Sequence, residues 1–125
     1  MKSIVQTNNA PAPIGPYSQA VKSGSTLYIS GQIALDPKTG ELVQDDIQTE
    51  TRQVMNNLLA ILNEAGGNFN HVVKCSIFVK DMTDFANIND VYGEYFITNP
   101  PARETVEVSA LPKNVNVEIS CIAVI

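Results

Sequence analysis

The sequence contains few of the residues that metal, redox or nucleic-acid chemistry requires. It has one histidine, His71, and two cysteines that do not form a Cys-x-x-Cys pair, so we expect no dedicated zinc site. It has only two arginines, Arg52 and Arg103, scattered lysines and a net charge of −5. Because nucleic-acid-binding proteins usually cluster Lys and Arg, we expect no nucleic-acid partner.

Long apolar runs are also missing. No stretch approaches the roughly 20 apolar residues that span a bilayer, and no apolar run of signal-peptide length follows Met1–Val5. We therefore expect a cytoplasmic protein without a membrane partner. Tryptophan is absent, whereas 44% of the residues are hydrophobic and 17% are charged, which is the balance of a folded globule. The sequence predicts one domain over residues 1–125, with a core of Val, Ile, Leu and Ala.

The two cysteines, Cys75 and Cys121, each lie within an apolar, strand-like run. They could pair with each other, but a buried free thiol is the commoner state in such surroundings. We expect reduced, buried thiols that take no part in catalysis.

Hydrophobic periodicity predicts an α+β fold. Gly31 interrupts the first strand, which indicates a bulge or a close backbone approach. In the first helix Asp45 can cap the N-terminus with Gln48 as its capping-box partner, and Gly66-Gly67 ends the helix. We expect a mixed sheet with both helices packed on one face. The expected elements are strands at 27–35, 73–79, 103–108 and 117–123 and helices at 45–65 and 84–96.

Side-chain alternation then suggests a functional face on the sheet. If the last two strands form a hairpin, their apolar faces must coincide, which places Arg103 and Thr105 on the same face as Glu118. Ser30 could join them from the first strand, whereas Glu104 would point to the core side or to the sheet edge. Ile122 and Val124 share the face of Glu118, and such a mixed surface suggests a subunit interface with clefts.

Two interpretations of Arg103 and Glu118 follow. They could form a surface salt bridge worth only about 0–1 kcal/mol. Alternatively, Arg103 could bind a substrate carboxylate through its planar guanidinium, which would leave Glu118 free to handle a water or a proton.

Several ordered motifs resemble those of the Rid (reactive intermediate deaminase, YjgF) family. The N-terminal stretch Ala10–Ala20 is similar to the first signature of the family, and Ser30-Gly31-Gln32-Ile33 followed by Pro37–Gly40 is similar to the second. Pro101–Val108, running on to Val117-Glu118-Ile119, resembles the C-terminal signature, and Asn89 matches a familiar helix position. The resemblance covers essentially the whole chain.

The resemblance implies a chorismate-mutase-like fold that assembles as a homotrimer, with three clefts between subunits. It implies hydrolysis of 2-iminobutanoate and 2-iminopropanoate to 2-keto acids and ammonia, without a cofactor or a metal. Arg103 would hold the substrate carboxylate and Glu118 would position or activate the attacking water. The remaining expected substrate-binding groups are the backbone at Gly31 and Thr105 and the side chains of Tyr17, Ser30 and Asn89.

Two departures and three alternatives stay open. Many family members have Ser and then Cys or Thr after the arginine, where this chain has Glu104, and the second glutamate of the last strand is Ser120 here. Tyr17 could merely pack, and Ser30 and Asn89 could be structural. The chain could also be a trimeric keto-acid-binding or regulatory module without catalysis. Ribonuclease activity, ascribed to some relatives, fits poorly with the negative charge and the lack of a histidine pair.

Overall fold

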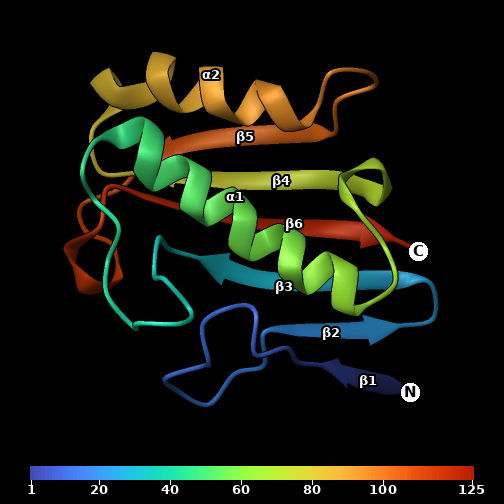
Figure 1. The fold of residues 1–125 in the computed structure, drawn as a ribbon. Coiled ribbons are helices and arrows are strands. Elements are labelled where there is room, and N and C mark those ends of the chain that lie inside the picture. The colour runs from blue at the N-terminus through green and yellow to red at the C-terminus, as the bar shows by residue number, and fades with distance from the viewer.

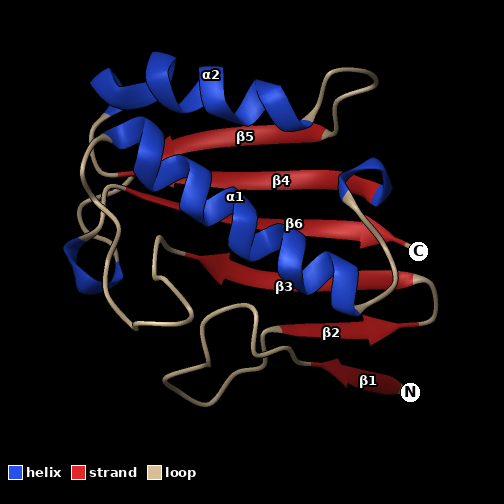
Figure 2. Ribbon diagram, viewed as in Figure 1, coloured by secondary structure: helices blue, strands red, loops and turns tan.

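The computed structural model describes residues 1–125 and shows one six-stranded sheet with two helices against one face (Figure 1). Every neighbouring pair of strands is antiparallel except β4 and β5, which are parallel. Figure 2 distinguishes the helical layer from the strands. This mixed sheet confirms the expected α+β class. In spatial order the strands are β1 (Lys2–Val5), β2 (Ala20–Ser23), β3 (Thr26–Gln32), β6 (Val117–Val124), β4 (Val72–Val79) and β5 (Ala102–Glu107), and the helices are α1 (Ile47–Glu64) and α2 (Phe85–Tyr95).

The core lies between the sheet and the two helices and consists mainly of aliphatic side chains. Residues that alternate along the central strands, such as Ile77 and Ile119, are fully buried, as is Leu58 of α1. Cys75 and Cys121 lie opposite each other on β4 and β6 as free, buried thiols, and burial raises the pKa of both. The expectation of buried free cysteines is confirmed. Neither helix is long and apolar enough to span a membrane.

Helix α1 begins one residue later than the sequence predicts. The N-cap is Asp46 rather than Asp45, because the extended backbone of Asp46 lets its carboxylate accept a hydrogen bond of 2.7 Å from the amide of Thr49. At the other end Ala65 is the C-cap and Gly66 adopts a φ of +87°, the left-handed conformation that favours glycine after a helix.

A bulge in β3 changes which residues face the core. The register against β6 shifts between Ile29 and Gln32, so the bulge expected at Gly31 is confirmed. The extra residue reverses the alternation, and Gln32 is therefore buried instead of sharing the exposed face of Tyr28. The strand also ends at Gln32 and not at Leu35. A second bulge, on β4, buries Val72 and exposes the predicted core residue Val73.

The predicted hairpin of the last two strands is wrong. Strand β4 lies between β5 and β6, because α2 provides a crossover long enough to place β5 parallel to β4. Arg103 is opposite Cys75 and Thr105 is opposite Ile77, so both lie on the helix-covered face, whereas Glu118 is opposite Phe78 on the other face. Hence the prediction that Arg103 and Thr105 share a face with Glu118 is also wrong.

The sheet face opposite the helices, which we call the open face, is uncovered in the chain. Glu104 lies there and not on the core side, where it forms an ion pair of 2.9 Å with Lys74 and accepts a hydrogen bond from Ser76. Around this polar group are apolar side chains that are half-buried or exposed. They are Tyr28, Phe78, Val106, Ile122 and Val124.

Candidate functional site

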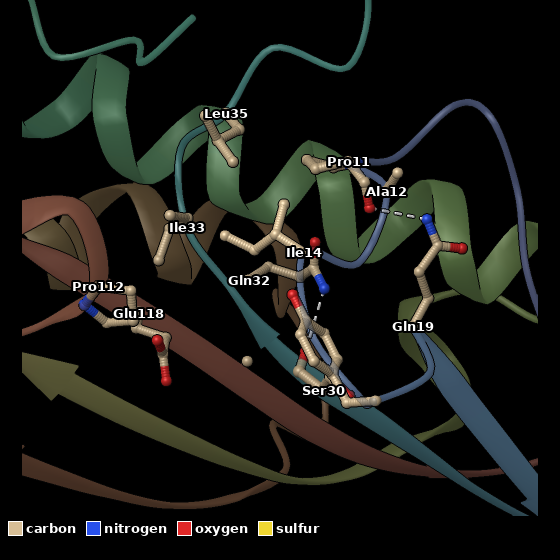
Figure 3. A pocket seen from close by; sticks show the side chains of 12 residues that line it. Pro11, Ala12, Ile14, Gln19, Ser30, Gln32, Ile33, Leu35, Pro112 and Glu118 are labelled. Atoms are coloured by element: carbon tan, nitrogen blue, oxygen red, sulfur yellow. Dashed lines mark hydrogen bonds between the residues drawn. The ribbon is translucent and has the colours of Figure 1, made fainter. Parts of the chain in front are cut away.

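Three loops meet at the ends of the central strands and line a cavity. Figure 1 shows residues 6–19, 33–46 and 108–116 at the end of the sheet where β3 ends and β6 begins. The cavity has a volume of about 480 Å³. Figure 3 shows its walls, which are mostly apolar above the carboxylate of Glu118. The lining residues are Pro11, Ala12, Ile14, Tyr17, Gln19, Ser30, Gly31, Gln32, Ile33, Leu35, Pro112 and Glu118.

The glycine at position 31 leaves room for the Glu118 carboxylate at the cavity. A Cβ atom at Gly31 would lie 2.5 Å from Oε2 of Glu118, which is closer than real Cβ contacts allow. The β3 bulge brings this bare backbone against the carboxylate. Burial raises the pKa of Glu118, and neither a hydrogen bond nor an ion pair offsets that effect. A carboxylate in this state is a stronger base than an exposed one.

The N-terminal loop is fixed by one buried amide, that of Gln19. Its Nε2 donates to the carbonyl oxygens of Thr7 at 3.0 Å and Pro11 at 2.9 Å, and its Oε1 accepts from the amide of Thr7 at 2.7 Å. The hydroxyl of Ser30 donates to the carbonyl oxygen of Ser18 at 2.6 Å, so Ser30 has a structural role as well as a place in the cavity wall. These bonds hold the loop that presents the cavity rim.

Tyr17 lies on that rim. Its side chain is 48% exposed and lines the cavity. Tyr17 therefore lies where it can contact a molecule in the cavity, and its role in binding stays a prediction. Its phenol is free to contact a molecule in the cavity or a neighbouring chain.

Arg103 forms a second polar site, under α2 at the sheet edge. Its Nη1 donates to Oδ1 of Asn89 at 2.7 Å, and its guanidinium carbon lies 5.0 Å from the ring centroid of Tyr92 and 5.5 Å from that of Phe85. The arginine is nevertheless exposed, and most of its five donors are unused. A permanently charged guanidinium held against two aromatic rings is suited to bind a planar carboxylate.

The surroundings of Arg103 form a shallow cavity of about 310 Å³. Thr105 lies one step along the same strand face, and its hydroxyl is buried without a hydrogen-bond partner. The cavity is lined by Asn89, Tyr92, Gly93, Phe96, Pro100, Pro101 and Arg103.

The sequence-predicted site is thus divided into two parts. Tyr17, Ser30, Gly31 and Glu118 meet in the first cavity, so Ser30 lies with Glu118 as expected but not with Arg103 and Thr105. The other predicted residues, Asn89 and Thr105, lie with Arg103 in the second site. Arg103 and Glu118 lie two strands and three residues apart, so their backbones are separated by roughly 14 Å at ordinary sheet spacings, on opposite faces.

Sequence reasoning missed several residues of the first cavity. Gln32 lies within the Ser-Gly-Gln-Ile motif, but its inward position depends on the bulge. Ile33 and Leu35 looked like core residues of a longer strand, whereas the strand ends before them and both line the cavity. The proline-rich composition of residues 10–16 was the available signal for Pro11 and its neighbours. No three His, Cys, Asp or Glu side chains converge to hold a metal ion.

Comparisons with known proteins agree with this architecture. A family model described as Endoribonuclease L-PSP matches residues 7–125. A RutC family protein of Pyrococcus horikoshii is 57% identical over 123 residues, which cover 98% of each chain. The 2-iminobutanoate/2-iminopropanoate deaminase of Mus musculus is 47% identical, covering 99% of this chain and 92% of the mouse protein. The structure of E. coli TdcF with bound serine matches with a TM-score of 0.94 at 41% identity and covers 98% of each chain. The chain therefore belongs to the Rid family, also known as the YjgF or L-PSP family.

Proposed function

We propose that the chain forms a chorismate-mutase-like homotrimer that hydrolyses 2-iminobutanoate and 2-iminopropanoate in clefts between subunits, without a cofactor or a metal. The observation that carries the proposal is the division of the site. One part offers an unpaired carboxylate without a cation, and the other offers a guanidinium with free donors but no base. Each part lacks what the other supplies.

A second subunit would bring the two parts together. The open face carries exposed apolar side chains such as Tyr28 and Val106, and burial of such surface drives association. If the edge strand β5 of one subunit packs beside the open face of the next, Arg103 approaches Glu118 of the partner subunit. Closed rotational symmetry then repeats the same cleft at each interface.

The residues in such a cleft suit imine hydrolysis. Arg103 holds the substrate carboxylate, helped by backbone groups at Thr105 and at the partner subunit's Gly31. Glu118 of the partner subunit takes a proton from water as the water oxygen bonds to the imine carbon, and this proton then passes to the nitrogen. The same carboxylate takes the proton of the new hydroxyl group as the C=O bond forms and the C–N bond breaks, and ammonia and the 2-keto acid leave. A protonated imine is already electrophilic, so positioning can supply much of the rate enhancement.

Three further side chains would line the cleft. The hydroxyl of Ser30 already donates to Ser18, so Ser30 can offer a substrate only acceptor lone pairs. The Oδ1 atom of Asn89 is occupied by Arg103, which leaves the Asn89 amide nitrogen as a donor. Tyr17 on the rim would close over the bound molecule.

A second candidate function is the binding of a small amino or keto acid without catalysis. The related TdcF structure with bound serine favours it. The unpaired carboxylate of Glu118 favours the enzyme over a keto-acid-binding module, because a carboxylate near an anion site repels a ligand that has no ammonium group.

A coupled assay separates the two candidates. Threonine dehydratase generates 2-iminobutanoate from threonine, and keto-acid release is followed with and without this protein. We expect acceleration by the parent protein, a loss of about 10²-fold or more for Glu118→Gln, and loss of both turnover and 2-oxobutanoate binding for Arg103→Ala. Glu118→Gln should still bind 2-oxobutanoate as well as the parent does. A parent protein that binds keto acids and accelerates nothing would establish the binding module.

A further inference from the structure

Helix α1 carries polar side chains on its buried side. Glu50 and Asn57 are 0% and 1% exposed, and Gln53 lies between them, half-buried. Spacings of three and four residues place all three on one stripe of the helix. Buried polar groups on a core-facing helix are costly unless they find hydrogen-bond partners. Gln53 and Asn57 bond to each other, and the other partners of Glu50 and Asn57 lie outside the helix.

Asn57 holds one wall of the Glu118 cavity. Its Nδ2 donates to the carbonyl oxygen of Ile33 at 3.1 Å and to that of Leu35 at 2.9 Å. Its own Oδ1 accepts from Nε2 of Gln53 at 2.9 Å, which fixes the orientation of the amide. Ile33 and Leu35 follow the end of β3 and line the cavity, so one side chain sets the course of the chain along this wall.

Glu50 holds the segment that leads into β6. Its Oε2 accepts from the amide of Asn116 at 2.9 Å and its Oε1 accepts from Nδ2 of Asn116 at 2.8 Å. Asn116 directly precedes β6, two residues before Glu118 and four after Pro112, which both line the cavity. The Glu50 carboxylate therefore anchors the segment that delivers Glu118.

A third buried polar residue of the same helix shows what a purely local role looks like. Thr51 is 0% exposed, and its hydroxyl donates to the carbonyl oxygen of Ile47 within α1 at 2.7 Å. It contacts neither wall through a hydrogen bond. Thr51, Glu50 and Asn57 are equally buried, but Thr51 bonds within its own helix whereas Glu50 and Asn57 bond to the cavity segments.

We propose that Glu50 and Asn57 are positioning residues, which from the rigid helix α1 fix the Ile33–Leu35 wall and the Asn116–Glu118 segment of the cavity. The proposal rests on the proposed function of that cavity. Small displacements matter there, because a shift of about 1 Å in a positioned group can cost two orders of magnitude in rate.

The proposal has two parts, which we call the Asn57 arm and the Glu50 arm. The Asn57 arm is tested with a substitution of similar shape and a matched control. Asn57→Leu keeps the branched shape and the number of heavy atoms and removes both donors, and Thr51→Val removes an equally buried hydrogen bond that reaches neither wall. We expect Asn57→Leu to raise KM for 2-iminobutanoate roughly tenfold and to shift the methyl NMR signals of Ile33 and Leu35. Thr51→Val should lower the unfolding temperature but leave KM and those signals unchanged.

If Asn57→Leu does not fold, a milder variant provides the same test. Gln53→Ala only frees the Asn57 amide to rotate, and it should move KM and the wall methyl signals in the same direction by a smaller factor. If a folded Asn57→Leu or Gln53→Ala shows parental KM and parental methyl signals, the Asn57 arm is wrong.

The Glu50 arm is tested by rescue. In Glu50→Gln the side chain can still accept from the Asn116 backbone amide and can donate to the Asn116 side chain once that amide flips, so the anchor survives. In Glu50→Leu it does not. We expect Glu50→Leu to lower kcat at least tenfold and to change the Glu118 carboxyl signal in ¹³C NMR, and Glu50→Gln to restore both. Equal kcat in Glu50→Leu and the parent would overturn this arm.

The NMR readouts distinguish this inference from the proposed function. If the parent protein hydrolyses no imine, the proposed function fails. The wall methyl signals and the Glu118 signal would still report whether the stripe positions the cavity. Unmoved signals in folded Asn57→Leu and Glu50→Leu would then reject the stripe by themselves.

Discussion

The two polar sites of the chain differ in how completely one subunit builds them. The Glu118 cavity is enclosed by three loops that buried side chains, Gln19, Glu50 and Asn57, tie to the rest of the fold. The Arg103 site lies on the edge strand β5, where Arg103 and its strand neighbours are exposed. One chain by itself therefore holds the base Glu118 in place, whereas Arg103 lies on an exposed strand that another subunit can reach.

The largest expected effect comes from mixing two inactive variants. Arg103→Ala and Glu118→Gln each lack one part of the site, so each trimer alone should be inactive. If each cleft takes Arg103 from one subunit and Glu118 from the next, random co-assembly of equal amounts restores about one cleft in four. We expect about a quarter of the parental rate of imine hydrolysis after the variants are unfolded and refolded together.

Two controls accompany this mixing experiment. Variants refolded separately and then combined should stay inactive, and sedimentation of the parent should give about 40 kDa, three times the chain mass of 13.5 kDa. A mass near that of one chain, or refolded mixtures with no activity, would mean that the two sites do not meet between subunits.

A methyl group at Gly31 should damage the Glu118 cavity and spare the Arg103 site. In Gly31→Ala the new Cβ would lie 2.5 Å from Oε2 of Glu118, so the carboxylate must move. We expect imine hydrolysis to fall by about 10²-fold, with 2-oxobutanoate still bound through Arg103 and the circular dichroism spectrum unchanged. Parental kcat in Gly31→Ala would show that the position of Glu118 is not critical.

The smallest expected effect concerns stability and its pH dependence. Burial raises the pKa of Glu118 in the folded protein, so its ionised form costs stability once the pH rises through that pKa. Glu118→Gln should therefore be more stable than the parent at neutral pH. The difference should shrink as the pH falls towards about 4.3, the ordinary glutamate pKa. Urea midpoints of both proteins across this range provide the measurement, and a variant that is less stable at neutral pH would contradict the assignment.

The same residues show how far sequence reasoning reached. The motif around Gly31, the stretch Ala10–Ala20 and the pair Arg103 and Glu118 identified the family and most members of both sites, because turns and functional groups leave local signatures. The hairpin assumption failed because alternation assigns side chains to a face only after strand neighbours are known, and the intervening β4 could not be read from the last two strands. The Asp46 cap differed by one residue for a simpler reason. Adjacent aspartates are equivalent until the backbone selects one.

What the sequence by itself determined is the two helices, four of the six strands (β3 to β6) and the apolar core, since these depend on local periodicity and backbone chemistry, whereas the short strands β1 and β2 were missed. Only the tertiary structure decided that Arg103 and Glu118 lie on opposite faces, that Gln32 turns inward while Ile33 and Leu35 line a cavity, and that Glu50 and Asn57 brace its walls. The physical reason is that strand order, bulges and long-range hydrogen bonds join residues far apart in the chain, and no local pattern records those partners.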